Sequence, residues 1–149
     1  MDRAGVPVGV VTAIAAPSRF RVTVRGRQDH AGGTLMGSRR DALATAAEVV
    51  LAVERIARET GRGTVGTLDV RPNMVNIVPG EVHLLADFRG IESAPIAESL
   101  ARFEAVADEI AARRSVTVEV VPIIREQPLA VAPDMAAAAD AVGIPSQQA

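Results

Sequence analysis

The sequence has 149 residues, which fits one domain, and 48% of them are hydrophobic while only 2% are aromatic. The net charge of −2 and the pI of about 5.7 give no sign of a nucleic-acid interface or a polybasic membrane patch, and no apolar run is long enough to span a membrane. The absence of cysteine excludes disulfides, thiolate metal sites and a thiol nucleophile. It also suits the cytosol, so we expect a cytoplasmic protein.

The first half of the chain predicts two strands and a helix. Residues 8–14 form a continuous apolar run, which is typical of a short strand buried on both faces. The segment from Arg19 to Arg25 alternates between apolar and polar residues, which indicates a half-buried strand. Ser38 and Asp41 have the spacing of a capping box, and we expect a helix from Asp41 to Thr60 after it.

The second half of the chain predicts three strands and two helices. Gly63 to Val70 and Glu81 to Arg89 are predicted strands, and Pro95 is the expected first residue of a second helix. A fourth strand follows at Val116 to Val120, and a last helix is expected at Asp134 to Ala141. The order βαββαβ predicts an α+β, ferredoxin-like fold: a four-stranded antiparallel sheet with both helices on one face.

Three polar residues lie in loops or at a strand end, where they could form a binding site. His30 lies in a loop of small residues after the first strand, Asn76 lies in the turn before the third strand, and Arg89 ends that strand. Glycines leave room for a ligand beside His30, and loops on a rigid scaffold often carry binding residues. Each residue also has a plain structural explanation, as a solvated turn histidine, an asparagine bonded to its own turn, or a solvated strand end.

Five segments in order resemble a known family. They are Gly9–Ala15, Asp29–Gly32, Arg39–Leu43, Asn76–Gly80 and Asp87–Arg89. Together they resemble the lid, or dimerisation, domain of the M20-family zinc-dependent amidohydrolases and peptidases. The most similar subgroup is the hydantoinase/carbamoylase type, which includes N-carbamoyl-L-amino-acid hydrolases and allantoate amidohydrolases. Two positions depart from the family: Leu35 stands where a proline is frequent, and Gly33 where a threonine is usual.

The resemblance implies roles for the three polar residues. His30 would be the catalytic residue that polarises the scissile carbonyl, or stabilises the oxyanion, in the partner subunit's site. Asn76 and Arg89 would bind the carboxylate of a small-molecule substrate, and an arginine fork matches a carboxylate well. The chain would then be the dimerisation and substrate-binding lid of a binuclear-metal amidohydrolase that cleaves N-carbamoyl (ureido) amino acids or related amides.

The resemblance also implies a domain division and a missing metal site. Residues 17–130 would be the lid, and residues 1–16 and 131–149 would be stubs of a catalytic domain that holds two divalent ions, zinc, manganese or cobalt. This chain has two histidines, His30 and His83, and no His-x-Asp or Glu-Glu motif. We therefore expect no metal ligands in this chain and no hydrolase activity from it alone, and we interpret His83 as a solvated residue.

The lid interpretation predicts a homodimer. In the βαββαβ order the strand Gly63–Val70 is an edge strand, and it has one charged residue, Asp69, and no proline. We expect it to pair with its own copy, with the helix Asp41–Thr60 packed beside its mate. The alternative is a free-standing ferredoxin-like domain that binds a ligand or a protein without catalysis, because this fold hosts many functions.

Overall fold

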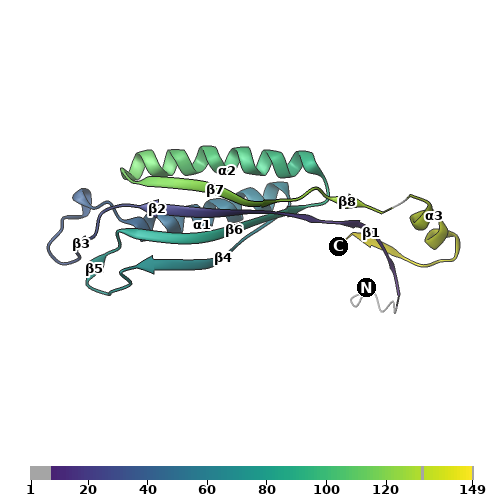
Figure 1. Cartoon of the computed structure of the whole chain (residues 1–149), viewed down its shortest axis with the longest axis horizontal. Helices are drawn as coiled ribbons and strands as arrows, with labels where there is room; N and C mark the ends of the chain where they lie inside the picture. The colour runs from purple at the N-terminus through teal and green to yellow at the C-terminus, as the bar shows by residue number, and fades with distance from the viewer. Residues whose placement is uncertain (1–7, 132, 149) are drawn as a thin grey trace.

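The main body of the computed structural model, which describes residues 8–131 and 133–148, is a four-stranded antiparallel sheet in the order β4-β6-β2-β7. Helices α1 and α2 pack against it and against each other (Figure 1). The elements are β2 (Ala16–Arg25), α1 (Ala42–Thr60), β4 (Arg62–Arg71), β6 (Glu81–Gly90), α2 (Ser93–Arg114) and β7 (Thr117–Arg125). This confirms the predicted α+β, ferredoxin-like fold. No described helix is long and apolar enough to cross a membrane.

The hydrophobic core lies between the sheet and the two helices. Alternate residues of the central strands β2 and β6 face it and are at most 2% exposed: Phe20, Val22, Val24, Val82, Leu84, Ala86 and Phe88. Phe103 of α2 contacts Phe20 and Phe88, with ring centroids 6.5 and 5.5 Å apart. Because Ala and Val supply much of the remaining core, these three rings anchor α2 on the sheet.

The N-termini of both helices differ from the prediction. Asp41 alone caps α1, because its carboxylate accepts hydrogen bonds from the backbone N–H groups of Leu43 and Ala44 at 2.9 and 3.0 Å. The capping box with Ser38 is wrong, since Ser38 ends a short 3-10 helix, η2 (Met36–Ser38). The prediction that Pro95 begins α2 is also wrong: α2 begins at Ser93, and Pro95 fits its first turn because N–H groups there have no partner within the helix.

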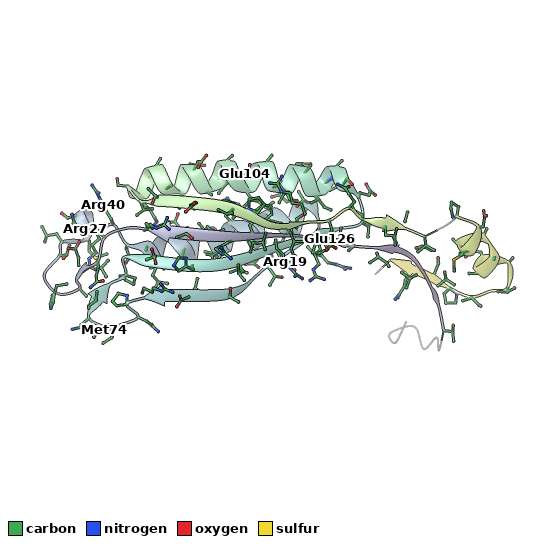
Figure 2. All side chains as sticks on the ribbon, in the orientation of Figure 1. Arg19, Arg27, Arg40, Met74, Glu104 and Glu126 are labelled. Atoms are coloured by element: carbon green, nitrogen blue, oxygen red, sulfur yellow. The ribbon has the colours of Figure 1, made fainter. Side chains whose placement is uncertain are left out.

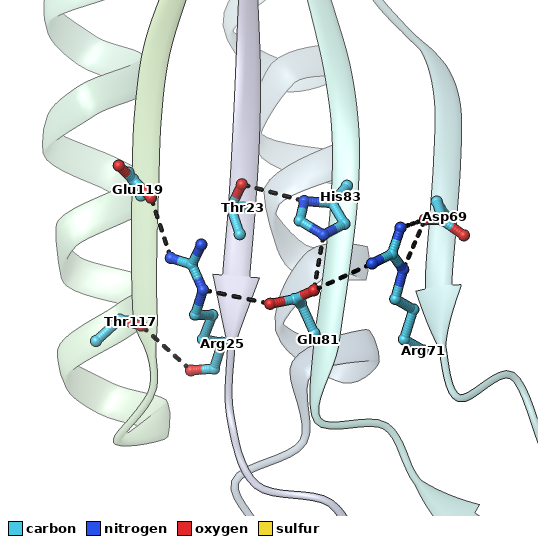
Figure 3. Close-up of polar contacts among 8 residues, drawn as sticks. All are labelled: Thr23, Arg25, Asp69, Arg71, Glu81, His83, Thr117 and Glu119. Atoms are coloured by element: carbon cyan, nitrogen blue, oxygen red, sulfur yellow. Dashed lines mark hydrogen bonds and ion pairs between the residues drawn. The ribbon is translucent and has the colours of Figure 1, made fainter.

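The sheet face opposite the core carries charged residues from all four strands (Figure 3). Their signs alternate across the four strands, in the order Glu119, Arg25, Glu81 and Arg71, and Arg71 also pairs with Asp69 on its own strand. His83 was expected to be solvated, but it is half-buried and bonds Glu81 through Nε2 at 2.8 Å and Thr23 through Nδ1 at 3.2 Å. The hydrogen bond with His83, and then the charge of Arg25, hold the pKa of Glu81 below its usual value.

A second, smaller sheet lies beyond one end of the main sheet (Figure 1). In it, β1 (Val10–Ile14) pairs with β8 (Leu129–Ala130) and β9 (Ser146–Gln148), and α3 (Pro133–Ala141) packs beside them. The expectation of a strand buried on both faces is wrong for the described residues, since β1 is half-buried and Ile14 is 48% exposed. The reason is that, among the described residues, β1 is flanked by two very short strands and one short helix.

Parts of the two predicted terminal segments lie outside the described residues. These are residues 1–7 of the segment 1–16, and Ala132 and Ala149 of the segment 131–149. Within the described part, the expected last helix is present as α3, and it is followed by β9, which the sequence pattern did not predict.

Gly26 is expected to be a stability determinant, because a Cβ there would lie 2.0 Å from the carbonyl oxygen of Arg40. Its N–H also donates to Gly80 at 2.8 Å, so the strand end is held between two loops. We expect Gly26→Ala to lower the free energy of unfolding by about 2–3 kcal/mol, measured by chemical denaturation. Gly37→Ala is the matched control, because its Cβ would meet nothing within 4 Å. Equal losses in both variants would show that the contact with Arg40 is unimportant.

Candidate functional site

His30 and Asn76 lie together at one end of the main sheet. The two-residue strands β3 (Asp29–His30) and β5 (Ile77–Val78) pair with each other, with His30 opposite Ile77. The backbone N–H of Ala31 donates to the carbonyl of Asn76 at 2.9 Å. Two loops that are far apart in sequence are thereby joined, and both predicted residues are exposed on the same loop end.

The orientation of the His30 ring is set by its own loop. Nδ1 accepts hydrogen bonds from the backbone N–H groups of Gly32 at 3.1 Å and Gly33 at 2.9 Å. An Nδ1 that accepts two N–H groups carries no proton, so in the neutral ring the proton is on Nε2. His30 therefore presents an outward N–H donor, which suits an oxygen that gains negative charge. The carboxylate of Asp29 does not orient the ring, because it pairs with Arg27 at 2.7 Å.

Arg39 stabilises the His30 loop through hydrogen bonds to two carbonyl groups of the loop. The sequence pattern did not indicate it as a site residue. Its half-buried guanidinium donates to the carbonyl oxygens of Ala31 at 2.5 Å and Thr34 at 3.1 Å. These bonds close the loop around the two glycines that hold Nδ1 of His30. The only signal in the sequence was the position of Arg39 within a segment shared with the family, since no local pattern shows which carbonyl groups an arginine reaches.

Removing Arg39 is expected to loosen the loop that orients His30. In Arg39→Ala we expect hydrogen-exchange protection of the Gly32 and Gly33 amides to fall roughly tenfold, because two charge-assisted hydrogen bonds are lost. Arg40→Ala is the control, because the Arg40 guanidinium makes no hydrogen bond or ion pair with any described residue. Unchanged protection in Arg39→Ala would show that the loop is held by its backbone alone.

The loop end is unusually apolar for a surface. Leu35 and Met36 are 79% and 77% exposed, and Met74 and Val75 on the neighbouring loop are also exposed. Figure 2 shows Met74 at this end of the molecule, away from the small sheet. Apolar side chains gathered beside a histidine donor are typical of a surface that another body covers.

Arg89 lies at the opposite end of β6. Its Nε and Nη2 donate to Oδ2 of Asp87 at 3.0 and 2.9 Å, and Arg19 approaches the same oxygen at 3.5 Å. The second oxygen of Asp87 is buried and has no hydrogen-bond partner among the described residues. Arg89 also lines a recess of about 280 Å³ with Arg62 and Pro95. The carboxylate of Asp87 fixes one edge of the guanidinium and leaves Nη1 available to a ligand.

The structure thus joins two of the three predicted site residues and separates the third. Arg89 is eight residues along β6 from Glu81, the strand end nearest His30 and Asn76. At about 3.3 Å per residue this separation is roughly 26 Å, too far for one small ligand to touch both ends. Within one chain, His30 and Asn76 do not share a site with Arg89.

The described residues do not fit a binuclear metal site. No group of three or more histidine, aspartate or glutamate side chains in residues 8–131 and 133–148 is arranged to hold a metal ion. A catalytic metal needs a fixed set of such ligands, and the described residues do not supply one.

The chain is similar in sequence to amidohydrolases over most of its length, although no family model matches it. It is 40% identical over 119 residues to N-carbamoyl-L-amino acid amidohydrolase from Geobacillus stearothermophilus, covering 78% of this chain and 29% of that protein. It is 37% identical over 132 residues to ureidoglycolate hydrolase from Oryza sativa, covering 86% and 27%. The chain therefore spans less than a third of the length of either relative.

Solved structures give the same result. An amidase of the hydantoinase/carbamoylase family from Burkholderia multivorans superposes with a TM-score of 0.90 at 32% identity, covering 99% of this chain and 38% of that one. Another from Burkholderia vietnamiensis gives 0.88 at 32% identity, with the same coverage. Sequence and fold agree over nearly all of the chain, and it belongs to the hydantoinase/carbamoylase family of amidohydrolases.

Proposed function

We propose that this chain is the dimerisation and substrate-binding lid of an amidohydrolase that cleaves N-carbamoyl (ureido) amino acids or related amides. The observation that carries the proposal is the separation of Arg89 from His30 and Asn76 at opposite ends of one sheet. A histidine that presents an N–H donor and an arginine that suits a carboxylate are complementary parts of such a site. They meet only if two subunits contribute to it.

An edge-to-edge dimer would bring these parts together. Strand β4 begins at Arg62, which lies opposite Arg89 in the sheet register, and ends at Arg71, beside the loop that holds Asn76. If β4 pairs antiparallel with its copy about a two-fold axis, the Arg89 end of one subunit lies beside the His30 and Asn76 end of the other. Each dimer would then have two composite sites.

The surface beside β4 suits this dimer. Leu68 of β4 is 48% exposed although it lies in register with the buried Leu84. On α1, Leu43 and Val50 lie on the side of the helix away from Glu48, which bonds α2. An extra residue in β4, Gly66, interrupts the pairing with β6 and bends this edge, so the regular segment after it would make most of the contact.

In the composite site, each residue would have a separate role. Two divalent metal ions, bound outside this chain, would activate water and polarise the substrate. Nε2–H of His30 would donate to the oxygen of the scissile carbonyl as negative charge develops there. Arg89, held by Asp87, would bind the substrate carboxylate from the other subunit, with the Asn76 amide as a further donor. The exposed Met36 and Met74 would be covered when the loop end enters the partner's site.

The small sheet supports the proposed division of the chain. Residues 17–130 would form the lid, and residues 1–16 and 131–149 would belong to the catalytic domain. In the described residues, β1, β9 and α3 lie apart from the main sheet, and β8 (Leu129–Ala130), at the end of the proposed lid, pairs with β1 and connects the two parts. A free-standing ligand-binding domain remains the competing function, and it predicts no dimer and no composite site.

We expect the purified chain to be a dimer at micromolar concentration and Leu68→Asp to be a monomer. A charge at this position would place two carboxylates next to each other across the two-fold axis, without disturbing the core. Sedimentation equilibrium measures both states. Val121→Asp is the control, since Val121 is 41% exposed on the opposite edge strand, β7. A monomeric unchanged chain, or equal dissociation in both variants, would rule out dimerisation through β4.

A further inference from the structure

One open recess in the described part of the chain is lined mainly by arginines. It has a volume of about 780 Å³ and lies between the start of α1 and the end of α2. Five of its nine lining residues are arginines: Arg27, Arg39, Arg40, Arg113 and Arg114. Figure 2 shows Arg27 and Arg40 close together near the loop end. The proposed substrate arginine, Arg89, does not line this recess.

The positive charge of this recess is only partly balanced. Arg113 and Arg114 both bond one carboxylate, Glu48, and hydrogen bonds from them lower the pKa of Glu48 to about 2. Arg27 pairs with Asp29 at 2.7 Å. Arg40 pairs with no carboxylate in the described residues, and Arg39 donates only to carbonyl oxygens. With Asp41 and with Glu109, whose charge also acts on Arg113, five arginines face four carboxylates.

An excess of guanidinium groups around one open space favours an anionic ligand. Guanidinium groups match the oxygens of a phosphate with paired hydrogen bonds, and the volume falls in the range of small-molecule sites. The chain as a whole has a net charge of −2, so the positive potential is local and does not suit a nucleic-acid strand. We propose that this recess binds a small phosphorylated metabolite through its phosphate group, with Arg40 as the main contact and Arg113, which also bonds Glu48, as a second donor.

A bound phosphate would act on a segment that also supports His30. Gly37 and Ser38 line the recess together with Arg39, whose guanidinium closes the His30 loop. Binding would restrain this segment and so the loop. This goes beyond the proposed function, because the anion site is built entirely within one chain and needs neither the dimer nor a catalytic domain.

Calorimetric titration of the full chain with inorganic phosphate tests the proposal. We expect saturable binding with one phosphate per chain, weakened roughly tenfold or more in Arg40→Gln and in Arg113→Gln, because each loses a charge-assisted hydrogen bond. Arg113→Gln leaves the bond between Arg114 and Glu48 in place. Arg58→Gln is the matched control, since Arg58 is exposed on α1, pairs with Glu54 and does not line the recess.

A second arm uses adenosine monophosphate as the phosphate carrier. Binding that is at least as tight as that of inorganic phosphate, and equally sensitive to Arg40→Gln, supports a site for a phosphorylated metabolite. No saturable phosphate binding, or equal weakening in Arg58→Gln and Arg40→Gln, would overturn the proposal, because attraction would then be only non-specific. Circular dichroism of each variant verifies that the fold is retained.

Discussion

Replacing His30 with alanine is expected to lower kcat by roughly 100- to 1,000-fold with little change in KM, in an enzyme that uses this chain as its lid. The loss of one preorganised donor to a developing oxyanion has an effect of this size. A suitable enzyme is a chimera in which this chain replaces the matching segment of the Geobacillus stearothermophilus relative. Steady-state hydrolysis of an N-carbamoyl amino acid gives both constants.

The second histidine is the control for this prediction. His83→Ala removes an imidazole from the charged face of the sheet, where it bonds Thr23 and Glu81. We expect it to leave kcat within about twofold, because His83 is in a polar network and not on the loop end. A His30→Ala chimera with unchanged kcat would show that the Nε2–H donor has no part in the reaction.

Replacing Arg89 with lysine is expected to raise KM for carboxylate-bearing substrates roughly 10- to 30-fold. A lysine keeps the charge but loses the planar fork and the two bonds to Asp87 that hold it. We expect kcat to change less, because a contact to a group that does not react acts mainly on binding. Arg21→Lys, an exposed arginine on the same strand face as Arg19, is the matched control.

The KM of an amide analogue of the substrate separates a loss of carboxylate recognition from a general loss of substrate binding. Arg89→Lys should hardly change it, because the analogue has no carboxylate to bind. Equal KM values for Arg89→Lys and the unchanged chimera on the carboxylate substrate would show that Arg89 does not bind it.

The sequence was a good guide to the main sheet because burial on one face imposes a strict alternation. Phe20, Val22 and Val24 had to be apolar to meet the helices, so the strand and its register toward the core could be predicted. The boundaries were less predictable: β2 begins at Ala16, before the alternation becomes clear, and the extra residue Gly66 in β4 changes no apolar pattern.

The site was only partly predictable for a different reason. His30, Asn76 and Arg89 could be selected by residue type and by resemblance, but their arrangement depends on contacts that no local pattern encodes. The pairing of β3 with β5 and the bonds of Arg39 to two carbonyl groups are such contacts. The length of β6 separates Arg89 from His30, and our proposal of a second subunit rests on this separation.

Subunit complementation tests the two-subunit site most directly. One chimera carries His30→Ala and the other Arg89→Ala, and each should be nearly inactive alone. If the two are mixed under conditions that exchange subunits, a mixed dimer has one site with both mutations and one site with neither. Random exchange makes half of the dimers mixed, so our account predicts recovery of about a quarter of the unchanged activity. If His30 and Arg89 of one chain worked together instead, every site in the mixture would carry one of the two mutations, and the mixture would stay as inactive as its components.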